Sequence, residues 1–258
     1  MSSLRIRLLR GVLLPLTLLV AWQAWGTATG NPRTPVPTRV LAAAVDLIGS
    51  GDLPLAILVS VGRVFAGFVI AATLAIPLGL AMGAFRSVER NVDPLVESFR
   101  PIAAIAILPL AILWLGTGTA SAMVIVAYAA FFPMVINTIA GVKRINPTFL
   151  RAAATMGLDR FRILRTVVIP GAMPSIAVGM RIAMGVAWTA IVAAELAVGA
   201  KAGGGGSGGI GQMMFVFYAY SIELNRIVVC MIAVGLVALL LDRALRGGMR
   251  LMMPWAAP

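Results

Sequence analysis

Four ionisable residues lie inside or beside long apolar runs, where a charge is costly and therefore marks a candidate functional position. They are Glu97, Arg100, Arg181 and Glu195. A charged residue at the middle of a membrane helix costs about 2.5–3.5 kcal/mol on insertion scales. Glu97 and Arg100 are three positions apart on one helix face, so they can neutralise each other. We predict that they form a structural pair within the membrane.

Arg181 and Glu195 are too far apart to pair within one helix. Their fourteen-residue separation corresponds to about 21 Å along a helix axis. If the substrate is an anion, Arg181 can serve its pathway, while Glu195 organises an outer gate and Trp188 between them forms a constriction. The candidate pathway residues are Arg181, Met184, Trp188 and Glu195. The alternative for each of them is packing against neighbouring spans, and small residues such as Gly179 and Gly185 favour close packing here.

The inventory of reactive side chains argues against catalysis. The chain has no histidine and one cysteine, Cys230, so the usual ligands of zinc and haem are missing. Without histidine there is no Ser-His pair for an intramembrane hydrolase. The glycine run Ala202–Gly211 lacks the Gly-Lys-Ser/Thr of a phosphate-binding loop, and we expect a flexible outer loop there. We expect no enzyme activity, and no metal or cofactor bound by this chain.

The composition indicates an all-α integral membrane protein. Of 258 residues, 60% are hydrophobic and 12% are charged, and the mean hydropathy is +1.00. A soluble domain has about 25% charged residues. The net charge of +12 is explained by basic residues at the cytoplasmic ends of spans. Binding of nucleic acid is not expected, because no basic stretch carries interleaved stacking aromatics.

Six apolar runs are long enough to cross a hydrocarbon core of about 30 Å, which needs about 20 helical residues. The predicted spans are 8–26, a span within 55–85, 92–116, 121–142, 172–199 and 226–245. Basic residues before the first run also leave a signal peptide as an alternative. Residues 31–54 are predicted to lie outside as an extended, Pro-rich stretch followed by an interfacial helix. We therefore divide the chain into 1–54, with the first span and this amphipathic segment, and a core of 55–258.

The basic residues predict the orientation. With the N-terminus in the cytoplasm, the inner segments hold Arg5, Arg7, Arg10, Arg86, Arg90, Lys143, Arg144, Arg151, Arg160, Arg162, Arg165, Arg243, Arg246 and Arg250, and the outer ones hold Arg33, Arg39, Lys201 and Arg226. This bias satisfies the positive-inside rule. Both termini and the loop 143–170 are predicted to be cytoplasmic.

The loop 143–170 is longer and more basic than a turn requires. Asn146 suits a helix N-cap, Pro147 the first helical position and Gly157 the C-terminal cap. On this short helix the predicted shared face comprises Phe149, Ala152, Ala153 and Met156, and it is shallow enough for another backbone to approach. Asp159 is predicted to cap a second helix that ends near Pro170. Such helices suit the docking of a soluble partner, or alternatively contact with anionic membrane lipid.

The spacing in this loop resembles a known signature. Ala152-Ala153, Gly157, then Val167 and Ile169-Pro170 match the register of the "EAA" motif of ABC importer permeases, with Arg151 where the motif has glutamate. Ser60–Gly83, Asp93–Gly118, Gly179–Leu196 and the C-terminal LLDRALRGGMRLMMPW are similar to the nitrate/sulfonate/taurine branch of that family. The resemblance implies ATPase-coupling roles for Phe149, Arg151, Ala152, Ala153, Met156, Gly157, Leu158 and Pro170.

This resemblance also implies an architecture and partners. The expected fold is that of a type I ABC importer permease with six spans, in the inner (plasma) membrane of a bacterium. The expected assembly is a homodimer with two cytoplasmic ATPase subunits, which bind ATP and Mg, and a periplasmic or lipid-anchored substrate-binding protein. The expected activity is import of a small anion of the sulfonate/taurine, nitrate or bicarbonate class by alternating access. The alternative is an ion-coupled secondary transporter that uses intramembrane carboxylates, for which Glu97 and Glu195 are the candidates.

Overall fold

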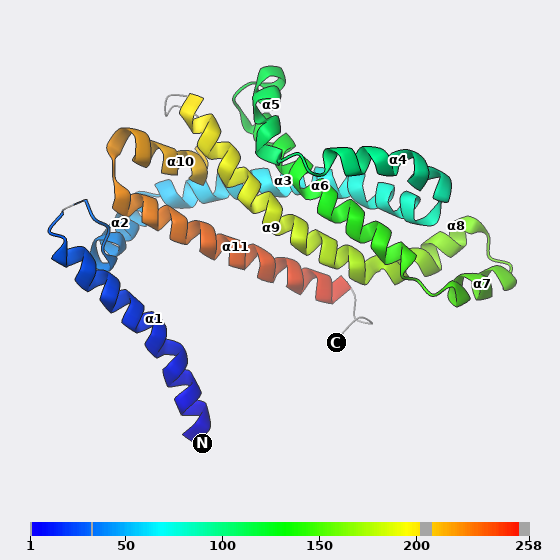
Figure 1. Cartoon of the computed structure of the whole chain (residues 1–258), viewed down its shortest axis with the longest axis horizontal. Coiled ribbons are helices and arrows are strands. Elements are labelled where there is room, and N and C mark those ends of the chain that lie inside the picture. The colour runs from blue at the N-terminus through cyan, green and yellow to red at the C-terminus, as the bar shows by residue number, and fades with distance from the viewer. Residues whose placement is uncertain (1, 32, 202–207, 253–258) are drawn as a thin grey trace.

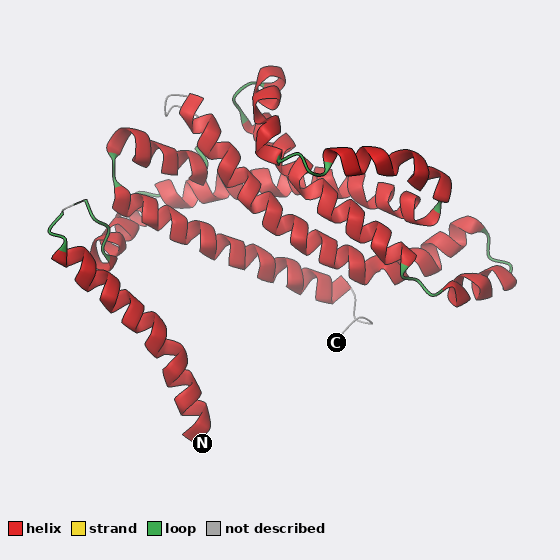
Figure 2. Cartoon of the chain, viewed as in Figure 1, coloured by secondary structure: helices red, strands yellow, loops and turns green. Residues whose placement is uncertain are grey.

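The computed structural model consists of helices joined by loops and describes residues 2–31, 33–201 and 208–252, with no strand among them (Figure 2). Side chains are described over 13–31, 33–198 and 208–249. The elements are α1 (Ser2–Ala28), α2 (Pro37–Gly49), α3 (Asp52–Ala84), α4 (Arg86–Phe99), η1 (Ala104–Ile107), α5 (Leu108–Leu115), α6 (Thr119–Lys143), α7 (Pro147–Thr155), α8 (Arg160–Ile163), η2 (Leu164–Val168), α9 (Ile169–Lys201), α10 (Ile210–Val216), η3 (Phe217–Ser221) and α11 (Leu224–Met252). The all-helical prediction is confirmed, while most of the predicted glycine loop, 202–207, falls outside the described residues.

Three long helices, α3, α6 and α9, form the centre of the molecule (Figure 1). Their contact surfaces are lined by small and branched residues. A Cβ added at Gly67 of α3 would lie 2.7 Å from the carbonyl oxygen of Met123 on α6, and one added at Gly79 would lie 2.6 Å from Cβ of Thr138. Glycine at these two positions therefore allows the α3 and α6 backbones to approach closely, as is typical between membrane helices.

Four helical segments are long and apolar enough to cross a membrane: Asp52–Ala84, Thr119–Lys143, Arg160–Val198 and Leu224–Met249. Their outer surfaces carry exposed leucines such as Leu58 and Leu240, which suits contact with lipid. In the first predicted span, the apolar part of α1 with described side chains is Leu13–Ala28. The six-span count and the cytoplasmic position of the termini stay predictions.

The third predicted span, 92–116, is not one straight helix. Its residues fall into α4 and the η1–α5 segment, which are bent by 85° relative to each other. Arg100 ends α4 and still has α-helical dihedral angles, and residues 101–103 after it lie in no helix. The break follows from Pro101, which has no backbone N–H to continue the α-helical hydrogen bonding after the Arg100 N–H bonds the Val96 carbonyl. If the bent pair crosses as one broken span, the number of spans becomes five.

The N-terminal helix α1 projects away from the other long helices and meets the rest of the chain near α2 (Figure 1). The Trp22 Nε1–H group donates a hydrogen bond to the Pro35 carbonyl at 2.9 Å, which fixes the turn between the two helices. The helix predicted within residues 31–54 is present as α2, which has proline at its first position, while the external position of this segment stays a prediction. α2 packs on α11, where the Arg226 guanidinium bonds Asp46 at 2.9 Å.

Candidate functional site

The short helix α7 has the ends that its sequence predicts. The Asn146 side chain accepts a hydrogen bond from the Thr148 N–H at 2.9 Å, and Pro147 follows at the first helical position. At the other end Gly157 has φ +78°, the left-handed geometry that glycine tolerates best. The N–H groups of Gly157 and Leu158 bond the carbonyls of Ala154 and Ala153 at 3.0 and 3.2 Å. These paired bonds close a Schellman motif, so α7 is a sharply bounded helix of two and a half turns.

The predicted face of α7 divides between two environments. Phe149 and Met156 are 63% and 72% exposed, and Ala152 between them is exposed as well. Ala153, by contrast, is 2% exposed and turns toward the body of the protein. Arg151 is exposed and Leu158 half-buried. The uncovered face thus has an alanine flanked by two large apolar side chains, which suits a protein partner.

The second predicted helix of the loop begins as expected but does not end at Pro170. Asp159 caps α8 by accepting a hydrogen bond from the Arg162 N–H at 3.2 Å. The chain then passes through the π-helical turn η2, where the Ile169 N–H bonds the Leu164 carbonyl, and runs on into α9. The predicted helix end at Pro170 was wrong. Proline has no N–H to donate, but the π-helical turn just before it already departs from α-helical hydrogen bonding, so the missing hydrogen bond does not end the helix. The loop is therefore joined directly to a membrane helix.

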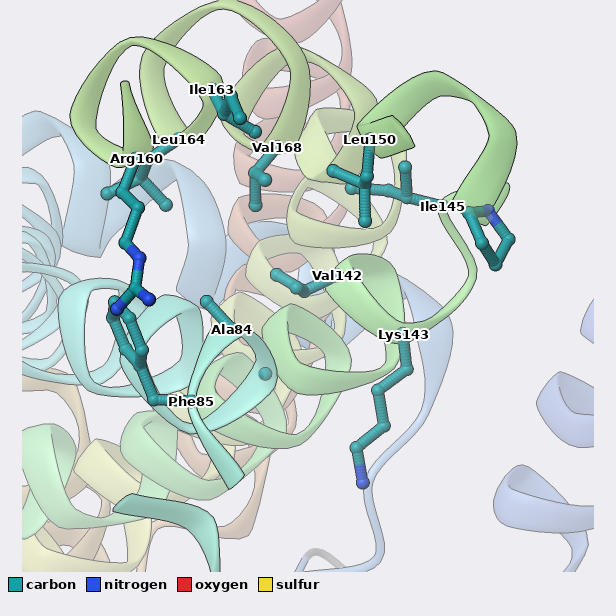
Figure 3. A pocket seen from close by; sticks show the side chains of 12 residues that line it. Ala84, Phe85, Val142, Lys143, Ile145, Leu150, Arg160, Ile163, Leu164 and Val168 are labelled. Atoms are coloured by element: carbon teal, nitrogen blue, oxygen red, sulfur yellow. The ribbon is translucent and has the colours of Figure 1, made fainter. Parts of the chain in front are cut away.

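A cavity of about 530 Å³ lies behind α7 (Figure 3). The last residues of α3 and α6 form one side of it, and α7, α8 and η2 form the other. Its lining is mainly apolar, with Leu150, Ile163 and Val168 among the members, and it includes the cations Lys143 and Arg160. Lys143 bonds Glu89 on α4. Because this cavity separates much of α7 from the membrane helices, the helix stands out from the body and presents its exposed face outward.

Glu195 lies in a buried polar network at the opposite end of α9. It is 2% exposed and forms an ion pair with Arg63 of α3, with Nη1 and Oε1 2.8 Å apart. The Ser60 hydroxyl lies 2.9 and 2.8 Å from its two carboxylate oxygens, and the Gly211 N–H donates to Oε2 at 3.1 Å. The Ile210 N–H in turn donates to Ser60 Oγ at 2.9 Å. This network joins α3, α9 and α10, and it supplies the hydrogen bonds that a buried carboxylate needs.

The glycines beside this network leave room for the carboxylate. A Cβ added at Gly209 would lie 2.1 Å from Glu195 Oε1, and one added at Gly211 would lie 2.5 Å from the Val192 carbonyl oxygen. Glycine is therefore required at both positions of this Gly-Ile-Gly sequence, because a larger residue would collide with the Glu195 side chain at Gly209 and with the α9 backbone at Gly211.

Replacing Gly211 with alanine should lower the stability of the folded protein. The new Cβ meets the α9 backbone, and such overpacking costs about 1–3 kcal/mol. Thermal unfolding of the purified protein in detergent measures the effect. Gly62→Ala on α3 is the matched control, since no atom lies within 4 Å of its added Cβ, and it should unfold at or above the wild-type temperature. Equal unfolding temperatures for the two variants would contradict the packing argument.

The other candidate pathway residues also lie in contacts between helices. Arg181 bonds Asp242 of α11 at 2.7 Å, and Arg246 bonds the same carboxylate. Trp188 is 2% exposed and donates from Nε1 to the Val234 carbonyl of α11 at 3.1 Å, while Met184 is 8% exposed in the central core. These contacts support the packing alternative, and the pathway role of these residues stays a prediction.

Glu97 of α4 and Arg100, which directly follows that helix, form the predicted pair, with Oε1 and Nη1 3.3 Å apart. Both side chains are more than half exposed, so the pair is not packed inside the protein.

The sequence argument missed three polar partners. Arg63 and Ser60 complete the network around Glu195, and Asp242 neutralises Arg181. Arg63 offered the clearest signal, since it is a lone arginine within an apolar run and such a charge requires a counter-charge. Neither its partner nor its depth follows from local spacing.

Comparison with known proteins identifies the family. Residues 75–251 match the model of the binding-protein-dependent transport system inner membrane component, which covers more than half of the chain. The chain is 33% identical to the taurine transport system permease protein of Escherichia coli over 247 residues, 92% of this chain and 86% of that protein. It is 33% identical to the nitrate import permease protein of Synechocystis sp. over 236 residues, 88% of this chain and 82% of the relative.

The fold matches as well. A chain of the MetNI methionine ABC transporter in an inward facing conformation superposes with a TM-score of 0.57 at 22% identity, over 76% of this chain and 95% of that one. The capped helix between two membrane helices, the apolar bundle and these similarities agree. The chain belongs to the inner membrane component family of binding-protein-dependent transport systems, and it is a multi-pass permease subunit of an ABC importer rather than an enzyme.

Proposed function

We propose that two copies of this chain form the membrane pathway of an importer for a small anion of the sulfonate/taurine, nitrate or bicarbonate class. The similarity to permeases named for taurine and nitrate supports this class. Two cytoplasmic ATPase subunits, which bind ATP and Mg, drive the cycle, and a periplasmic or lipid-anchored binding protein delivers the substrate. Membrane lipid surrounds the assembly.

The observation that carries the proposal is α7 with its exposed apolar face. Phe149, Ala152 and Met156 are uncovered on a helix that is capped at both ends and joined through α8 and η2 to α9. A motion of α7, imposed by an ATPase that closes on ATP, therefore reaches a membrane helix without passing through a flexible linker. Repeated closing and opening gives alternating access to the two sides of the membrane.

The buried network disfavours the ion-coupled secondary transporter. A coupling carboxylate must exchange a proton or a cation during transport, whereas Glu195 is held by Arg63, Ser60 and the Gly211 N–H. The remaining candidate, Glu97, is exposed beside Arg100.

Reconstitution tests the proposal. The chain is co-purified with the ATPase and binding protein encoded beside its gene, and uptake of taurine, an alkanesulfonate, nitrate and bicarbonate is measured in proteoliposomes. We expect uptake of one of these anions that requires ATP and the binding protein, and that stops with an ATPase variant unable to hydrolyse ATP. Uptake driven by an ion gradient without the ATPase would overturn the importer. ATP-driven transport of none of the four would overturn the anion class alone.

A further inference from the structure

An open groove of about 430 Å³ lies where the break between α4 and α5 meets α6 and α9. Its polar lining residues are Arg100, Tyr128 and Asn137, and its apolar ones include Ile182 and Val186 of α9. Arg100 is the charged residue among those that line it. These residues differ from the four pathway candidates that the sequence suggests.

The groove lies near the middle of two membrane helices. Pro133 of the lining is ten residues, about 15 Å, from the end of α6 at Lys143, and fourteen residues, about 21 Å, from its start. Val186 is the eighteenth of the 33 residues of α9. The Tyr128 hydroxyl donates to the Phe99 carbonyl at 2.6 Å and so holds the end of α4 against α6 at this depth. The break is therefore placed deep in the membrane and far from its surfaces.

Two features of the groove are incompatible with lipid. Residues 101–103 lie in no helix, and irregular backbone at membrane depth is tolerated only inside protein or along a water-filled cavity. The Arg100 side chain is 53% exposed and its partner Glu97 is 56% exposed, so protein of this chain does not enclose them. Glu97 pairs with one nitrogen of the Arg100 guanidinium, Nη1, and the exposed remainder of the group requires water or an anion at this depth.

We propose, building on the proposed function, that this groove is a wall of the aqueous pathway and that Arg100 is its anion-attracting residue. A small oxyanion and its water fit in the volume, since one water molecule takes about 30 Å³. Arg100 provides the charge, and the Tyr128 hydroxyl and Asn137 carboxamide provide hydrogen-bonding groups. A lipid phosphate is not the anion, because headgroups lie about 15 Å from the middle of the bilayer. The apolar remainder of the lining suits rapid passage rather than tight binding.

Cysteine labelling in the full chain tests whether the groove holds water. The single native cysteine is replaced (Cys230→Ala), and Val186→Cys is compared with Val69→Cys on α3. The two valines are matched: they are 40% and 42% exposed, and each is the eighteenth residue of a 33-residue helix. A charged, membrane-impermeant thiosulfonate should label Val186→Cys about 30-fold faster or more, because a charged reagent rarely enters hydrocarbon. Equal rates would overturn the proposal and assign the groove to lipid or to a covering protein surface.

The charge of Arg100 is tested in the same background. Arg100→Gln should lower the ratio of anionic to cationic thiosulfonate labelling rates at Val186→Cys by about fivefold or more, because it removes the positive charge beside the pathway. Arg100→Lys should keep the ratio, and Glu97→Gln should raise it. An unchanged ratio in Arg100→Gln would overturn the role of Arg100. Labelling requires neither ATPase nor substrate, so its failure is distinct from failure of the reconstituted transport that tests the proposed function.

Discussion

Replacing Glu195 with alanine is expected to destabilise the folded protein by about 3–5 kcal/mol, the usual cost of removing one partner of a buried ion pair. The substitution removes several interactions at once. The carboxylate neutralises Arg63, which is 5% exposed, and accepts hydrogen bonds from the Ser60 hydroxyl and the Gly211 N–H. Unfolding of the purified protein in mixed detergent micelles, followed as denaturing detergent is added, measures the change in free energy.

A double-mutant cycle separates the ion pair from general damage to the core. Arg63→Ala alone should also be strongly destabilising, and the double variant should cost less than the sum of the two by about 0.5–3 kcal/mol. Glu223→Ala is the control, since this partly exposed carboxylate shares Arg226 with Asp46 and should change stability by no more than about 1 kcal/mol. Additive losses at Arg63 and Glu195 would show that the two side chains are not energetically coupled.

Replacing Phe149 with alanine is expected to weaken binding of the ATPase about 30-fold or more and to reduce ATP-driven uptake in parallel. Large aromatic side chains at the centre of an interface contribute about 2 kcal/mol or more, and Phe149 is the large aromatic side chain of α7, 63% exposed beside Ala152. Co-purification of the tagged chain with the ATPase, followed by stimulated ATPase activity in lipid, measures both effects. Met156→Ala should also weaken ATPase binding and reduce uptake, but by a smaller factor.

The neighbouring helix provides a matched control for this substitution. Phe161 of α8 is 69% exposed, and Phe161→Ala removes the same kind of side chain from the same loop without altering α7. The Phe161→Ala variant should still bind the ATPase as the wild type does. If both phenylalanine variants bind the ATPase equally well, α7 is not the docking helix, and contact with anionic lipid becomes the better interpretation of the loop.

The helices and helix ends that were predicted correctly from the sequence depend on local signals. The length and apolarity of the runs predicted helices, and three residues with specific local chemistry, Asn146, Gly157 and Asp159, predicted where α7 begins and ends and where α8 begins. These signals succeed because a cap acts on backbone groups two to five residues away, within reach of the sequence pattern itself. The same loop carried the family resemblance that the comparisons confirm.

Pairings between distant residues were decided by tertiary structure alone. Glu195 pairs with Arg63, which is 132 positions away in the sequence, and Arg181 pairs with Asp242, which is 61 positions away. Those partners depend on which faces of α3, α9 and α11 pack together, and the inward turn of Ala153 depends in the same way on how α7 lies against the bundle. The bend between α4 and α5 had a local cause in Pro101, but its consequence, an arginine that lines an open groove beside the middle of α6 and α9, exists only because these two helices pack beside it.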